Sequence, residues 1–154
     1  MSAPEHACSL LAMARKDFDA VRGMIDNPLF ADEIFGFHAQ QAIEKSLKAW
    51  LTICGVDYPH THDLSRLLSL LETQGIDMDR YWPVVELTLF AVQARYDADL
   101  LDSEAPLDRL DIIDQVEQVL AAVVAVLVAA TPDNTDTLGK GADSNPIAGI
   151  ARGN

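Results

Sequence analysis

Apolar residues recur every three or four positions along most of the chain, and glycines and prolines separate five such segments. No stretch alternates apolar and polar residues for long enough to predict a strand. The pattern therefore predicts an all-α protein. Short connections between helices of similar length favour an antiparallel up-and-down bundle of four to five helices.

The first two expected helices have clear start and stop signals. One begins near Ser2, where Ser2 and Glu5 have the spacing of a capping box, and stops near residues 27–28. The next runs from Asp32, taken as its N-cap, to a stop at Gly55. Together they predict two long helices joined by a short loop.

Two shorter helices are expected next. The third opens at Thr61 or Asp63, whose side chains can cap it, and closes at Gly75. The fourth runs from about Asp79 to Ala94 and tolerates a proline in its first turn. An acidic stretch then leads away from it.

The fifth expected helix covers residues 108–130, and its second half is apolar nearly all round. Such a helix is either central in the bundle or partly covered by a second subunit. Its longest uninterrupted apolar run, 119–130, is short of the ~20 residues that cross a bilayer, so no membrane is expected. Residues 131–154 are rich in glycine and predict a disordered tail after a 1–130 domain.

Composition narrows the function classes. At 154 residues the chain fits one domain, and its net charge of −13 repels phosphate backbones, which argues against general nucleic-acid binding. Cys8 and Cys54 have no recognisable spacing, and no secretory signal is visible. We therefore expect a cytoplasmic protein with unpaired cysteines.

The second expected helix is the most informative segment. Its core stripe has helical spacing and consists of Phe35, Ala39, Ala42, Ser46, Ala49, Trp50 and Ile53. The opposite arc collects His38, Gln41, Glu44, Lys45, Lys48 and Thr52. Two readings stay open for this arc. It is either a solvated face with a Glu44–Lys48 i,i+4 ion pair, or a local cationic site in an acidic protein.

Two further segments could carry chemistry. The loop His60–Asp63 pairs two histidines with an aspartate, but a metal site needs three or four converging ligands and no second cluster supplies them. No metal or cofactor is therefore expected, and helix capping explains the loop. Arg95 and Tyr96 near the end of the fourth helix either complement its dipole or bind a phosphate and stack on a base.

Three elements of the chain resemble the HEPN (higher eukaryotes and prokaryotes nucleotide-binding) domain family. Residues 37–49 are similar to the family pattern FxAQQAxEKxLKA, Thr61–Leu64 with the following leucines to THDLxxLL, and Ala94–Tyr96 to ARYP. They occur in the family's order over roughly residues 5–130. Together they are fairly specific, whereas each alone is weak.

The resemblance implies a helical bundle that often forms a homodimer. It also implies a partner, since such domains are commonly encoded beside a minimal nucleotidyltransferase in toxin–antitoxin-like pairs. Carried over by position, the candidate nucleotide-binding residues are Glu44, Lys45, Lys48, His62, Arg95 and Tyr96.

Two departures from the family pattern bear on activity. Ribonuclease members carry an arginine followed after four to six residues by a histidine, and no histidine follows any arginine here at that spacing. Asp97 also replaces the proline of ARYP, which weakens phosphate binding there. The preferred interpretation is a non-catalytic nucleotide-binding and interaction module, with a HEPN ribonuclease toxin and a small-molecule sensor as alternatives.

Overall fold

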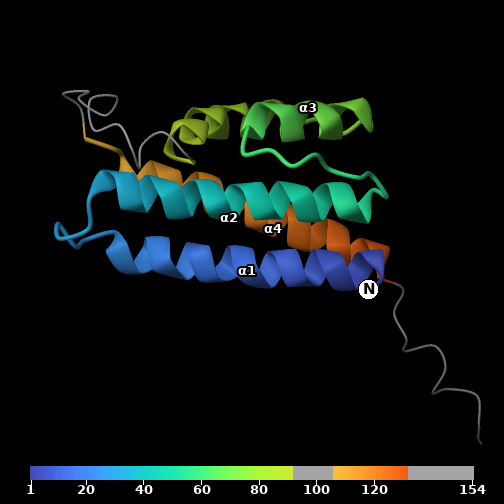
Figure 1. Cartoon of the computed structure of the whole chain (residues 1–154), viewed down its shortest axis with the longest axis horizontal. Coiled ribbons are helices and arrows are strands. Elements are labelled where there is room, and N and C mark those ends of the chain that lie inside the picture. The colour runs from blue at the N-terminus through green and yellow to red at the C-terminus, as the bar shows by residue number, and fades with distance from the viewer. Residues whose placement is uncertain (92–105, 132–154) are drawn as a thin grey trace, which may run out of the picture.

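The computed structural model describes residues 1–91 and 106–131, and all regular elements in these ranges are helical (Figure 1). The elements, in chain order, are α1 (Ala3–Met24), α2 (Asp32–Ile53), α3 (Leu64–Thr73), the 3₁₀ helix η1 (Asp79–Phe90) and α4 (Arg109–Ala130). The predicted all-α helical bundle is confirmed.

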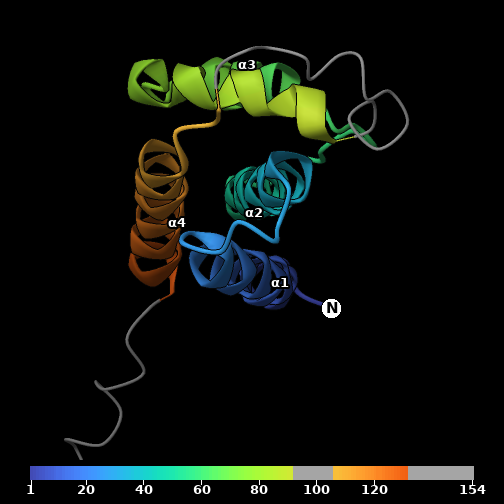
Figure 2. The ribbon, with the colours of Figure 1, turned by 90° about the vertical axis from the view of Figure 1, so that its left-hand side faces the viewer.

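Helix α2 lies at the centre of the bundle and contacts every other helix. It forms an antiparallel pair with α1, and α4 packs along both of them (Figure 1). In Figure 2, α3 and η1 form a layer on the side of α2 that faces away from α1. The central helix is thus α2, and not the apolar helix expected over residues 108–130, which is α4 in the structure.

Helix ends follow the local sequence with one exception. The Ser2–Glu5 capping box forms in both directions, and Gly55 adopts the left-handed φ of +74° that ends α2. Asp63 caps α3 by accepting from the Ser65 amide. The exception is Asp32. Ala31 is the N-cap of α2, and the Asp32 carboxylate instead accepts hydrogen bonds from the start of α4.

The fourth helix departs from the prediction in type. It is a 3₁₀ helix that contains Pro83, which has no amide hydrogen and so removes one hydrogen bond from the backbone ladder. Its predicted continuation to Ala94 falls in residues 92–105, outside the described residues. The predicted acidic exit lies mostly in the same range. The predicted tail lies in residues 132–154, which are also outside the described residues.

The core is densest around α2. The expected stripe is buried, with Ile53 partly so, and Ile43, Leu47 and Leu51 on other sides of the helix are also buried. At Gly36, α2 approaches η1 so closely that a Cβ atom would lie 2.6 Å from Cγ of Phe90. A glycine is required there because the Phe90 ring occupies the space of a side chain.

Helix α4 is peripheral. It buries Ile112, Val116, Val119 and two more residues against the bundle, while Val128 is 68% exposed. Among the described helices, only α4 is long and apolar enough by composition to cross a bilayer. Core helices of soluble bundles have the same composition.

Candidate functional site

A cluster of polar side chains surrounds Glu44 on α2. The Glu44 side chain is 5% exposed, and its Oε1 accepts from Lys48 Nζ at 2.7 Å. Its Oε2 lies 2.9 Å from Nδ1 of His62 and accepts from Gln40 at 2.8 Å. Helix α2 thus supplies three of these four groups, and the loop before α3 supplies His62.

The Glu44 carboxylate is held in its charged form. Burial raises the pKa of Glu44, but hydrogen bonds from Lys48, Gln40 and His62 together with the Lys48 charge lower it by more. The net pKa lies below the ordinary value of 4.5. Glu44 is therefore an anion that organises the cluster, which does not suit it to act as a general acid near neutral pH.

The cluster continues towards the N-terminus of α1. Lys48 Nζ lies 5.4 Å from the centroid of the Tyr58 ring, close enough for a cation–π interaction. The Tyr58 hydroxyl is 2.7 Å from Nε2 of His6, and the two rings are stacked. Side chains from α1, α2 and the α2–α3 loop therefore form one line of polar contacts from His6 to His62.

Lys45 belongs to a separate cluster. Its Nζ donates to Oδ2 of Asp17 on α1 at 2.5 Å, and the other oxygen of Asp17 lies 2.9 Å from Nδ1 of His38. The Asp17 side chain is largely buried between the two helices. This cluster joins α1 to α2 and leaves the Lys45 charge compensated.

The structure brings together only part of the predicted site. Glu44, Lys48 and His62 are in contact, Lys45 is paired elsewhere, and Arg95 and Tyr96 lie outside the described residues. The predicted Glu44–Lys48 pair is confirmed. The solvated-face interpretation is wrong, because α2 is covered on this side by α1 and by the loop that carries Tyr58 and His62.

Four contributors were not identified from the sequence as site residues, and one of them is His6, which contacts Tyr58. Gln40 lies within the motif, but nothing in the pattern distinguishes it from its neighbour Gln41. Asp17 and Tyr58 lie far from the motif in sequence, 28 residues from Lys45 in the case of Asp17. Only the packing of α1 and the loop against α2 reveals these two.

The histidine loop serves mainly to start α3. Thr61 Oγ1 accepts from the Asp63 amide, and Asp63 caps the helix, as the capping explanation predicts. His62 turns towards Glu44, whereas His60 is exposed. Within residues 1–91 and 106–131, no three His, Cys, Asp or Glu side chains are grouped as metal ligands.

A model of the HEPN domain matches residues 7–127, which is most of the chain. The chain belongs to the HEPN family. Neither a curated protein nor a solved structure matches it. Membership identifies a module of a nucleotide-binding and ribonuclease-like family. Residues 37–49, which resemble the HEPN helix signature, lie in α2, and Glu44 and Lys48 from this segment are in the polar cluster.

Proposed function

We propose that this HEPN domain is a non-catalytic binding and assembly module. It would form a homodimer, pair with a minimal nucleotidyltransferase in a toxin–antitoxin-like system, and present the His62 end of the polar cluster to a nucleotide or to that partner. The proposed location is the cytoplasm.

One observation carries the proposal: both lysines of the HEPN signature form ion pairs with largely buried carboxylates of the same chain. Lys48 is paired with Glu44 and Lys45 with Asp17, so that their charges stabilise the contacts of α2 with itself and with α1. A ribonuclease site would instead need a free base near a cation at the scissile phosphate. The arginine–histidine pair that supplies those groups in cleaving HEPN proteins is missing from the sequence.

The exposed apolar side of α4 supports assembly. Together with Phe18 of α1, Leu120, Val124 and Ala125 line a groove of about 570 Å³, and Val128 is exposed one turn further along α4. The groove is also lined by four charged residues, two of each sign: Arg15, Asp19, Arg22 and Glu117. Exposed apolar patches of this kind mark protein–protein contacts. We define Phe18, Val124, Ala125 and Val128 as the α1/α4 face and propose that a second copy covers it.

Nucleotide binding is the finer part of the proposal, and His62 is its most accessible candidate. The His62 side chain is 57% exposed while its Nδ1 is fixed by Glu44. An imidazole held in this way can donate to a phosphate or stack on a base when the ligand approaches from solvent. Lys48, behind it, would add positive charge only in part, because Glu44 compensates it.

Calorimetric titration with ATP, GTP and AMP tests nucleotide binding. We expect saturable binding that His62→Ala abolishes and His60→Ala, at an exposed histidine of the same loop, leaves unchanged. Incubation with RNA tests the enzyme alternative. Cleavage that Arg95→Ala abolishes would overturn the non-catalytic assignment in favour of a HEPN ribonuclease.

A further inference from the structure

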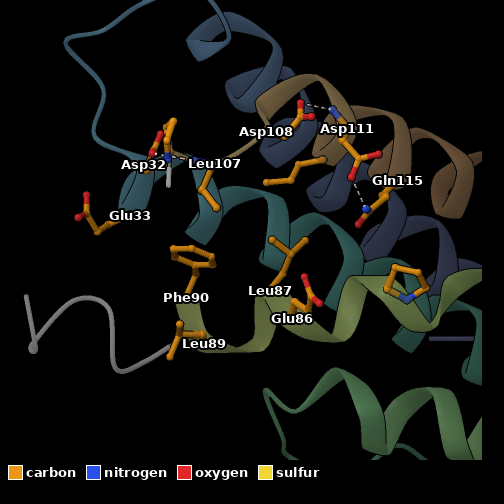
Figure 3. Close-up of a pocket in the computed structure, with 13 residues that line it drawn as sticks. Asp32, Glu33, Glu86, Leu87, Leu89, Phe90, Leu107, Asp108, Asp111 and Gln115 are labelled. Atoms are coloured by element: carbon orange, nitrogen blue, oxygen red, sulfur yellow. Dashed lines mark hydrogen bonds between the residues drawn. The ribbon is translucent and has the colours of Figure 1, made fainter. Parts of the chain in front are cut away.

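A second cleft lies at the other end of α2, bounded by η1 and the start of α4 (Figure 3). Its volume is about 540 Å³, within the roughly 300–1,000 Å³ typical of small-molecule sites. Its apolar lining comes from η1, including Leu87 and Phe90, and from the α4 side, including Leu107 and Ile112. Helix α2 contributes two carboxylates to the lining, Asp32 and Glu33 (Figure 3). The polar cluster around Glu44 contributes no residue to this cleft.

Carboxylates surround the apolar lining. Five of the described residues that line the cleft are acidic: Asp32, Glu33, Glu86, Asp108 and Asp111. Among the lining residues within 1–91 and 106–131 there is no lysine, arginine or histidine. A cleft with an apolar interior and negatively charged carboxylates around it attracts cations and repels anions.

Three of the five carboxylates already have structural roles. Asp32 accepts from Arg109, Asp108 caps α4, and Asp111 accepts from Gln115. Glu33 and Glu86 have no hydrogen bond or ion pair with any described residue, and of the five carboxylates these two have no structural role within the described part of the chain. The guanidinium of Arg109 does not neutralise them, because it donates to Asp32 and to backbone carbonyls of Met24 and Phe30.

We propose that this cleft binds a small organic cation with an apolar body. The body would contact Leu87, Phe90 and Ile112, and the cationic group would lie at the rim beside Glu33 or Glu86. Nucleotides are excluded from this cleft by their charge, so the proposal is independent of nucleotide binding at His62. By composition, residues 92–105 are net acidic, with four acidic residues and one arginine.

Calorimetry of the full chain with 4-phenylbutylamine, 4-phenylbutanol and 4-phenylbutanoate tests the proposal. The three ligands share one apolar body and are positive, neutral and negative, respectively. We expect saturable binding of the amine, binding of the alcohol weaker by up to about fivefold, and none of the carboxylate. The double variant Glu33→Gln/Glu86→Gln should lower the affinity for the amine to about that for the alcohol, and it should leave the affinity for the alcohol unchanged.

The control is Asp26→Asn/Asp57→Asn, which changes the net charge equally at two exposed carboxylates outside the cleft and outside the α1/α4 face. Leu89→Ala, in the lining, should weaken both amine and alcohol, whereas Leu110→Ala should not. Absence of amine binding, or an equal loss in both charge variants, would overturn the proposal. Amine binding that appears only when Leu100 and Leu101 are changed to serine would also overturn it, because that outcome assigns the cleft to residues 92–105. A change in the mass of the assembled protein in the Glu33/Glu86 variant would do the same, because it assigns the cleft to a second copy.

Discussion

The Oε1 atom of Glu44 accepts a hydrogen bond at 2.7 Å from Nζ of Lys48, one helical turn further along α2. Both side chains are nearly buried, with 5% and 13% of their surfaces exposed. An i,i+4 pair on a helix surface contributes only about 0.3–0.5 kcal/mol, but a buried pair must be complete, because either charge alone would be left without water or counter-ion.

Glu44→Gln should therefore lower the free energy of unfolding by about 2–4 kcal/mol, because it leaves the Lys48 charge unpaired and weakens the contact to His62. Urea denaturation measures this loss. The matched control is Glu33→Gln near the start of the same helix, which should change stability by less than about 0.5 kcal/mol. Equal stability of the two variants would show that the Glu44–Lys48 pair is not a structural contact.

The depressed pKa of Glu44 predicts how stability depends on pH. A carboxyl group whose pKa is lower in the folded than in the unfolded chain stabilises the fold above its unfolded pKa, near 4.5, and loses this contribution as the pH falls through the folded pKa. The stability difference between the wild type and Glu44→Gln should thus be constant at neutral pH and shrink below about pH 4.5.

Urea denaturation of both proteins at a series of pH values measures this difference. The subtraction cancels other acid-sensitive groups such as Glu5, whose pKa is lowered by hydrogen bonds from the backbone and side chain of Ser2. A difference that grows on acidification would contradict the assignment of Glu44 as a stabilised anion.

Gly36→Ala should destabilise the protein although alanine favours helices. The gain in helix propensity is about 1 kcal/mol, but the new Cβ would lie 2.6 Å from the buried Phe90 ring, and such overpacking costs about 1–3 kcal/mol. Gly23→Ala in α1 is the control, since nothing lies within 4 Å of its Cβ position and its stability should stay equal or rise. Thermal unfolding of the two variants should move in opposite directions, and a rise for both would show that Phe90 moves aside freely.

Much of the fold could be predicted from local signals. The Ser2–Glu5 capping box, the cap at Asp63 and the stop at Gly55 act within a few residues, so the sequence specifies them directly. The helical period of α2 likewise predicts its core stripe. The type of η1 was missed, because the position of Pro83 is compatible with the first turn of an α-helix and with a 3₁₀ helix alike.

The site was harder to predict than the fold. Periodicity places Glu44, Lys45 and Lys48 on one arc, but it cannot tell whether that arc faces water or a neighbouring helix, nor that Lys45 pairs with a different carboxylate. The answer depends on Asp17 and Tyr58, which the bundle brings to α2 from elsewhere in the chain. Two lysines that look like a cationic patch in sequence are therefore compensated in the structure.

Sedimentation equilibrium of the full chain tests the central claim, that this HEPN domain is an assembly module, most directly. We predict twice the mass of the 16.8 kDa chain, and a single-chain mass for Val128→Asp, which puts a charge on the α1/α4 face. Leu110→Asp, at a residue of α4 that is 72% exposed and lies outside that face, should remain dimeric. A wild-type protein of single-chain mass, or a dimer that Val128→Asp leaves intact, would contradict the account.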